Sequence, residues 1–289
     1  MTQKLKDKVA VITGGTRGFG FAIAQAYVRE GAAVVVASRS AQSVEKAVQD
    51  LHAMGGQASG IPCDVGQREQ VQALAQHAVD TFGKFDIWIN NAGITAPYGP
   101  TMQIDPETFV NVIQTDILGV YYGSVCAMKH FLPKGAGKLI NILGRGARQP
   151  VPLQNGYASS KAWVRSFTLA LAKEYKDSGI TIAAFNPGLM ETDLMENIEV
   201  IAGYEDQLQP LETVMRMWGN PPEVPAETAV RLASSATDGR TGMEVRTLGL
   251  TRILSGLIGE AIRRLVRLPV PEREFNVRIV TAETPGNLC

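Results

Sequence analysis

A glycine-rich segment, TGGTRGFG at residues 13–20, constrains this chain more than any other feature. It directly follows the apolar run Val9–Ile12, which predicts a buried strand, and it opens onto a helical apolar pattern over Phe19–Arg29. Glycines let the backbone turn tightly and approach a ligand closely, because they have no Cβ. A strand, a glycine turn and a helix N-terminus in this order favour pyrophosphate binding by free N–H groups. The alternative is an ordinary strand-to-helix turn, since one such motif alone is a weak signal.

Three further motifs accompany the glycine turn. Asn90–Gly93 (NNAG) follows an apolar strand, and Asn186–Gly188 (NPG) ends another, with Thr192 shortly after it. Tyr157 and Lys161, in YASSK, lie one helical turn apart on the same face. In this order and at this spacing, the set resembles the classical short-chain dehydrogenase/reductase family over most of the chain.

Strands and helices alternate in the predicted secondary structure. Apolar runs predict strands at Val9–Thr13, Ala33–Ala37, Gln57–Pro62, Ile87–Ile89, Lys138–Leu143, Thr181–Phe185 and Gly242–Leu248. Amphipathic patterns predict helices at Phe19–Glu30, Ala41–Met54, Gln67–Phe82, Pro106–Phe131, Tyr157–Ser178 and Ala226–Thr237. The alternation predicts an α/β fold, a doubly wound parallel (Rossmann) sheet that binds ligands beyond the carboxyl ends of its strands. We expect one domain over residues 1–249, followed by an extension over 250–289; the resemblance implies a substrate lid at 189–225.

Composition narrows the classes of protein that fit. The chain has 289 residues, 45% of them hydrophobic, with 28 basic and 28 acidic side chains, so no general attraction to nucleic acid is expected. Cys63, Cys126 and Cys289 are too far apart for a disulfide framework or a metal site, which fits a reducing compartment. The N-terminal residues run directly into the first strand, leaving no room for a signal peptide, and we expect a cytoplasmic protein.

The end of the second predicted strand bears on which nicotinamide cofactor is used. A carboxylate there would bind the adenosine ribose and repel a 2′-phosphate, but Ser38 and Arg39 occupy this place, and Arg17 lies within the glycine turn. Two guanidinium groups can clamp a phosphate, which favours NADPH over NADH; the alternative is two solvated surface arginines. The resemblance extends the cofactor site to Gly14, Thr16, Arg17, Gly18, Phe19, Gly20, Ser38, Arg39, Asp64, Val65, Asn90, Gly93, Tyr157, Lys161, Pro187, Gly188 and Thr192.

Tyr157 is the candidate general acid, and Lys161 is placed to lower its pKa and to hold the nicotinamide ribose. The implied reaction is hydride transfer from the nicotinamide to the carbonyl carbon of a small-molecule substrate, while Tyr157 protonates the oxygen. Two positions depart from the family pattern: Gly144 stands where a serine is usual, and Asp116 where an asparagine is usual. These departures keep a second hypothesis open, a regulatory or scaffold protein that binds NADPH with little or no catalysis.

The sequence beyond residue 249 is unusual for the family. Apolar residues recur at helical spacing over residues 250–267, with Arg263, Arg264 and Arg267 at the far end. Such a basic amphipathic helix fits peripheral contact with an anionic membrane, a partner, packing on its own domain, or an oligomer interface. The resemblance also implies a homodimer or homotetramer formed by the fourth and fifth helices.

Four short stretches of the sequence are similar to segments of the chlorophyll b reductases, which reduce a formyl group on a large apolar tetrapyrrole. The stretches are Trp88, Leu143–Gly146, Asn220–Glu227 and Arg278–Glu283. A bacterial-type carbonyl reductase with another bulky apolar substrate explains the same residues.

Overall fold

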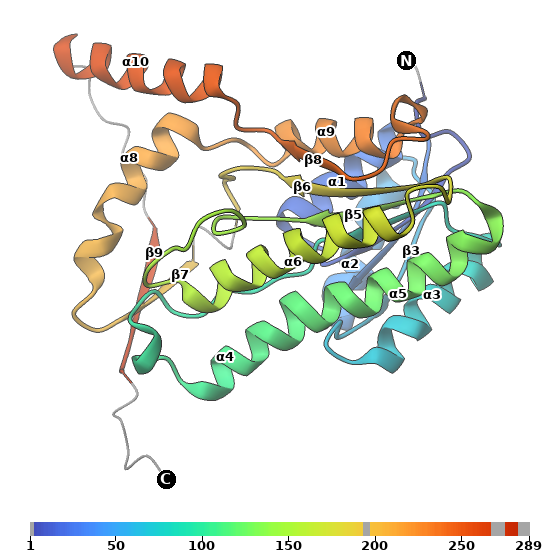
Figure 1. Cartoon of the computed structure of the whole chain (residues 1–289), viewed down its shortest axis with the longest axis horizontal. Helices are drawn as coiled ribbons and strands as arrows, with labels where there is room; N and C mark the ends of the chain where they lie inside the picture. Colours follow the sequence, from blue (N-terminus) through green and yellow to red (C-terminus); the bar gives the residue numbers. More distant parts are fainter. Residues whose placement is uncertain (1–2, 193–196, 267–274, 283–289) are drawn as a thin grey trace.

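The computed structural model describes residues 3–192, 197–266 and 275–282 of the chain (Figure 1). In chain order the elements are β1 (Val9–Thr13), α1 (Gly18–Arg29), β2 (Ala33–Ser38), α2 (Ala41–Ala53), β3 (Ala58–Pro62), α3 (Arg68–Phe82), β4 (Ile87–Asn90), η1 (Thr101–Gln103), α4 (Pro106–Val112), η2 (Ile113–Leu118), α5 (Gly119–Phe131), η3 (Leu132–Lys134), β5 (Gly137–Ile142), α6 (Asn155–Glu174), β6 (Ile180–Asn186), β7 (Asn197–Ile201), η4 (Glu205–Leu208), α8 (Gln209–Trp218), α9 (Glu223–Ala233), η5 (Ser235–Thr237), β8 (Met243–Arg246), α10 (Leu250–Val266) and β9 (Asn276–Val280).

The main sheet has the strand order β3-β2-β1-β4-β5-β6-β8, and every neighbouring pair in it is parallel. The order reverses between β1 and β4, and in open α/β sheets such a switch point is where ligands bind. The predicted doubly wound Rossmann sheet is therefore confirmed. All seven predicted strands are present, to within two residues at each end.

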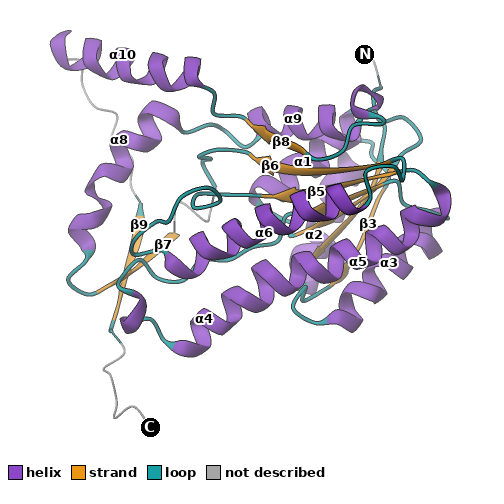
Figure 2. Cartoon of the chain, viewed as in Figure 1, coloured by secondary structure: helices purple, strands orange, loops and turns teal. Residues whose placement is uncertain are grey.

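Helices cover both faces of this sheet (Figure 2). Alternate residues of one strand enter opposite cores: Ala10 and Ile12 pack with α1, α2 and α9, whereas Val9 and Val11 pack with α3, α5 and α6. Strands buried on both faces read as continuous apolar runs, which is why the sequence pattern located them well. The long predicted helix at Pro106–Phe131 is continuous but contains one π-helical segment, η2.

Backbone hydrogen bonds join the two ends of the segment that we predicted as a lid, residues 189–225. The backbone N–H of Asn220 donates to Leu189 O at 3.0 Å, and the N–H of Glu191 donates to Asn220 O at 3.0 Å. Between these residues the described part of the lid contains β7, η4 and α8. The sequence pattern of this segment is irregular, and it therefore did not indicate the strand and helices that the segment forms.

The C-terminal extension packs on the lid. The predicted helix is present as α10, which lies against α8 at the upper left of Figure 1. The chain then supplies β9, a strand that we did not predict, which pairs in parallel with β7 from Asn197↔Asn276 to Ile201↔Val280. Arg267 and Cys289 lie outside the described residues. Among the described helices, none is long and apolar enough to cross a membrane.

Candidate active site

The glycine turn after β1 has the geometry of an anion cradle. Gly14 and Gly18 have φ angles of +61° and +51°, a region that L side chains rarely adopt. A Cβ at Gly20 would collide with the carbonyl oxygen of Gly14 and with the Asn91 side chain, so a glycine at this position allows α1 to start close to the turn. The residue before α1, Arg17, makes no side-chain cap bond to the helix. The turn and the start of α1 therefore fit a pyrophosphate group.

Asn91, at the end of β4, holds this turn in place. Its Nδ2 donates to Thr13 O at 3.0 Å and to Gly14 O at 3.1 Å. Its neighbour Asn90, which the resemblance assigned to the cofactor, directs its side chain into the interior, where Nδ2 donates to Asn141 Oδ1 at 2.8 Å. The side chain of Asn90 thus braces the strands, whereas Asn91, which the sequence analysis did not single out, supports the turn. The two adjacent asparagines gave no signal to separate them.

The remaining predicted cofactor residues are distributed along the carboxyl edge of the sheet. Ser38 ends β2, and Arg39 and Arg17 are both exposed. Thr192 lies against the glycine turn, because a Cβ at Gly18 would be 3.5 Å from Thr192 Cβ. Further positions on this edge are Thr16, Phe19, Asp64, Val65, Pro187 and Gly188, of which Phe19, Val65 and Pro187 are buried.

Tyr157, Lys161 and Asp116 form one cluster, to which α6 contributes the first two. Lys161 Nζ lies 5.2 Å from the centre of the Tyr157 ring and 3.3 Å from Asp116 Oδ2. Asp116 Oδ2 also accepts a hydrogen bond from Ser160 Oγ at 3.0 Å, and its Oδ1 accepts one from the Ile94 N–H at 2.9 Å. The carboxylate is fully buried, and the lysine is 3% exposed. Asp116 therefore acts as a fixed charge that positions the lysine.

The π-helical segment η2 presents Asp116 to the cluster, and π-helical turns within α-helices are frequent at functional sites. Ser160 and Ile94 are parts of the cluster that sequence reasoning did not identify. Ser160 directly precedes Lys161 in the YASSK motif, which is the signal that could have identified it. The Ile94 contact is made by its backbone, so no side-chain pattern could have revealed it.

Opposing effects set the pKa values of the pair. Burial raises the pKa of Tyr157 above its ordinary value; Lys161 opposes this, whereas Asp116 adds to it. Burial would lower the pKa of Lys161, but the charges of Asp116 and Tyr157 outweigh burial and raise it. The pKa of Lys161 is therefore raised, whereas Lys161, contrary to the expectation from sequence, does not bring the pKa of Tyr157 below its ordinary value. Tyr157 is protonated at neutral pH, as a proton donor must be.

Gly144 lies directly beside the reactive hydroxyl. A Cβ at this position would collide with the Tyr157 hydroxyl, so the place of the family's usual serine side chain is filled by the tyrosine itself. Of the two arginines that follow, Arg145 is exposed, and Arg148 Nε donates to Glu244 Oε1 at 2.6 Å. Glu244 thus engages Arg148 on the outer strand β8.

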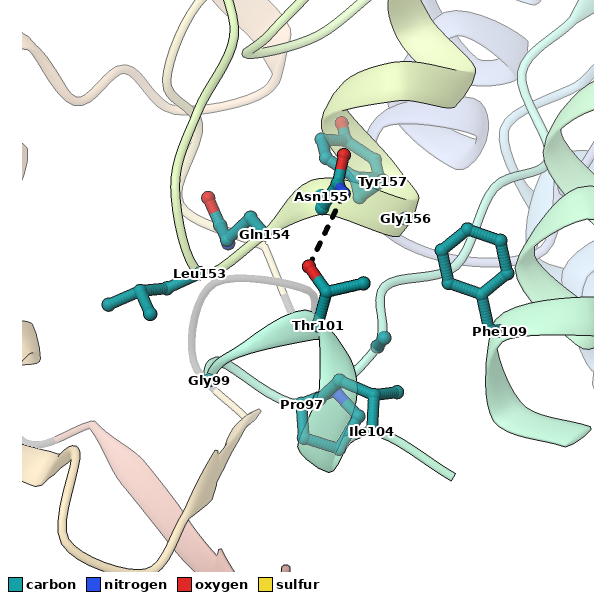
Figure 3. Close-up of a pocket in the computed structure, with 11 residues that line it drawn as sticks. Pro97, Gly99, Thr101, Ile104, Phe109, Leu153, Gln154, Asn155, Gly156 and Tyr157 are labelled. Carbon is teal, nitrogen blue, oxygen red and sulfur yellow. Dashed lines mark hydrogen bonds between the residues drawn. The ribbon is translucent and has the colours of Figure 1, made fainter. Parts of the chain in front are cut away.

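A narrow pocket reaches Tyr157 from the lid side (Figure 3). Its walls include the apolar side chains of Ile104, Phe109 and Leu153 and the polar side chains of Thr101 and Asn155. Asn155 Nδ2 donates to Thr101 Oγ1 at 3.3 Å. The lid strand β7 joins this wall through Tyr98, whose N–H donates to Glu199 O at 2.7 Å. The lid and the pocket are therefore connected through backbone hydrogen bonds.

A doubly wound sheet with this glycine turn and a tyrosine–lysine pair on α6 has the architecture of a nucleotide-dependent oxidoreductase. The chain belongs to the short chain dehydrogenase family, whose model matches residues 8–200. It is similar to 3beta-hydroxysteroid dehydrogenase 1 of Eggerthella lenta, with 36% identity over 244 residues, 84% of this chain and 92% of the relative. It spans 62% of the length of a further relative, the uncharacterized oxidoreductase YxnA of Bacillus subtilis (strain 168).

Two solved structures share the fold. A 3-ketoacyl-(acyl-carrier-protein) reductase from Brucella melitensis, complexed with NADH, superposes with a TM-score of 0.74 at 29% identity, covering 84% of this chain and 97% of that one. A putative gluconate 5-dehydrogenase from Beutenbergia cavernae, with bound NADP, gives a TM-score of 0.73 at 26% identity, covering 85% and 97%. The structural relatives thus include both an NADH and an NADP complex.

Proposed function

We propose that this protein is an NADPH-dependent reductase that converts the carbonyl group of a bulky apolar small molecule to an alcohol. The observation that carries the proposal is the buried Tyr157–Lys161–Asp116 cluster beside a glycine turn that fits a dinucleotide. When bound, NADPH supplies the hydride. Tyr157 donates the proton to the substrate oxygen, and the Lys161 ammonium stabilises the phenolate that remains. Asp116 keeps the ammonium in place.

The preference for NADPH rests on the end of β2. Ser38 and Arg39 bring no carboxylate to this place, and Arg39 and Arg17 are exposed at the same edge of the sheet. Two guanidinium groups at this edge suit a 2′-phosphate, since arginine binds phosphate by charge-assisted, often paired hydrogen bonds. The 2′-hydroxyl of NADH offers no such charge to the two guanidinium groups.

The apolar side chains of Ile104, Phe109 and Leu153 in the wall of the narrow pocket support an apolar substrate. A formyl group on a large ring, as in the resemblance to chlorophyll b reductases, is one form of such a substrate. We further propose a cytoplasmic homodimer or homotetramer that assembles through α5 and α6. In support, Tyr121 on α5 is 44% exposed beside Phe167 on α6, which stacks on Trp163 at 4.8 Å between ring centres.

The second candidate is an NADPH-binding protein with little turnover, and Gly144 is the observation that favours it. No hydroxyl at this position can bind the substrate oxygen, and the loss of one such donor costs ~10²–10³ in rate. The backbone N–H of Gly144 and the exposed side chain of Arg145 are the candidate donors that remain.

The two candidates are separated by titrating the protein with NADPH and NADH by fluorescence and then adding bulky aldehydes and ketones. A reductase binds NADPH more tightly and oxidises it with at least one carbonyl compound. The Tyr157→Phe variant should lose about 10²-fold or more in turnover, because it lacks the acidic proton, while its Kd for NADPH should change little. Tight binding with no oxidation across a broad panel would favour the non-catalytic candidate, and no binding of either nucleotide would contradict both.

A further inference from the structure

Helix α10 exposes its apolar face to solvent. Leu254, Ile258 and Leu265 are 58%, 59% and 84% exposed, and Leu257 and Ile262 lie beside them with about half of their surface free. At 3.6 residues per turn these side chains fall on one side of the helix. In Figure 1, α10 lies at the edge of the molecule, next to α8. A helix of a globular protein ordinarily turns its apolar side to the core, so this orientation is inverted.

The opposite face of α10 is already bound to the lid. Gly256 allows a close approach, since a Cβ there would be 2.5 Å from Trp218 Nε1, and this nitrogen donates to Ile253 O at 3.3 Å. Glu260, 9% exposed, accepts a hydrogen bond from Arg216 of α8 at 3.2 Å. Polar and glycine contacts therefore fix the helix on α8 and direct its apolar side outward.

Charge identifies the surface that suits this face. The described side chains of α10 include one acid, Glu260, and two bases, Arg263 and Arg264. Glu260 pairs with Arg216, Arg263 and Arg264, and Glu212 also pairs with Arg216, so three arginines face two carboxylates. The cluster is net positive, and Arg264 is 66% exposed. A second copy of α10 laid against the first would bring a cluster of the same net positive charge. The partner must offer an apolar interior for the leucine and isoleucine side chains and anionic groups for the arginines. The surface of an anionic lipid bilayer has both.

We propose that the outward face of α10 docks on the surface of an anionic lipid bilayer. The leucine and isoleucine side chains enter the boundary between headgroups and acyl chains, and Arg264 lies at the level of the lipid phosphates. The helix lies in the plane of the membrane surface, and the lid, through α8, lies next to it.

Flotation of the full-length protein with vesicles tests this proposal. Wild-type protein should float with vesicles of phosphatidylcholine and phosphatidylglycerol, float less with phosphatidylcholine alone, and bind less in high salt. The Ile258→Glu/Ile262→Glu variant should bind about tenfold less, because two charges enter the apolar face. Met54→Glu is the matched control: Met54, at the end of α2, is 38% exposed and belongs to another surface, so binding should be unchanged.

Three results would overturn the proposal: no flotation of the wild type with the anionic vesicles, equal loss in the Met54→Glu control, or equal binding to both kinds of vesicle. A protein that does not float but forms dimers that the double variant dissociates would assign the face to a second copy. Because both variants change exposed residues, circular dichroism should show an unchanged fold. Vesicle binding needs no turnover, so its failure is distinct from failure of the proposed function.

Discussion

Asp116 places a buried negative charge 3.3 Å from the Lys161 ammonium, at a position where the family pattern leads one to expect a neutral amide. Burial alone would favour a neutral lysine, and the opposing charges of Asp116 and Tyr157 reverse that preference. The consequence is a lysine that stays charged well into the alkaline range.

Replacing Asp116 with asparagine removes this charge but keeps an oxygen that can accept the Ile94 N–H. We expect the pKa values of both Lys161 and Tyr157 to fall, because Asp116 raises both. The alkaline limb of kcat/KM for reduction, which needs protonated Tyr157, should then move to lower pH. Asp116→Ala, which also loses the hydrogen bond, serves as the comparison. An unchanged alkaline limb in Asp116→Asn would show that the carboxylate does not tune the pair.

Gly144 tests whether the missing serine side chain limits the reaction. A Cβ at residue 144 collides with the Tyr157 hydroxyl, so Gly144→Ala should displace the acid and lower kcat for carbonyl reduction by about tenfold or more. Gly144→Ser adds a hydroxyl together with the same collision. Should the serine variant exceed the wild type while the alanine variant loses activity, the hydroxyl would be the limiting group.

Arg39 tests the choice of cofactor. Arg39→Ala removes an exposed cation from the end of β2, and a hydrogen bond to a charged group contributes ~1.5–3 kcal/mol. The Kd for NADPH should therefore rise by about 10- to 100-fold, while the Kd for NADH changes little. Fluorescence titration of both nucleotides measures this, and equal losses for the two would contradict a phosphate clamp.

At the scale of elements, the contact between α10 and α8 depends on a glycine inside a helix. Alanine is favoured over glycine in a helix interior by ~1 kcal/mol, so Gly256→Ala would stabilise an isolated α10. Within the molecule, a Cβ at residue 256 would collide with Trp218 and with the carbonyl oxygen of Met217. The cost of this collision opposes the gain in helix propensity.

Gly256→Ala should therefore loosen the lid, and amide hydrogen exchange in α8 should become faster. Gly259, in the same helix, has nothing within 4 Å of an added Cβ. Gly259→Ala is thus the matched control and should leave exchange in α8 unchanged or slower. The same exchange rate in both variants would mean that α8 is ordered independently of α10.

The sequence predicted the elements of the Rossmann sheet well, because buried parallel strands and amphipathic helices each carry a local pattern. It did not predict the pairing of β7 with β9. Asn197–Ile201 and Asn276–Val280 are short, partly polar segments, and their structure depends on each other across a long stretch of chain. At the site, Tyr157 and Lys161 were visible as a motif, whereas the inward direction of Asn90 and the Ile94 contact arise from tertiary packing.

At the scale of the whole molecule, Glu244 joins three parts of the chain. From β8 it binds Arg148 of the segment after β5 and Arg165 of α6, at 2.6 Å and 2.8 Å. Burial would raise its pKa, but the hydrogen bonds from the two arginines outweigh burial and lower the pKa from 4.5 to about 2. This contribution to stability is complete above pH 4.5 and is lost as the pH falls toward 2.

Glu244→Gln should therefore lower the Tm at neutral pH, and the difference from wild type should shrink between pH 4.5 and pH 2. Thermal unfolding followed by circular dichroism across this range measures the effect. A difference in Tm that stays constant with pH would mean that packing at residue 244, rather than its charge, is responsible.

The pairing of β7 with β9 also sets the order in which this protein can be completed during synthesis. The glycine turn, the tyrosine–lysine pair and all strands of the main sheet are synthesised before β9, because β9 begins at Asn276. Domains fold as their segments emerge, and pairing between distant segments comes late. The segments of the main sheet therefore exist before β7 has its partner strand, and β7 can pair only after Asn276–Val280 has been made.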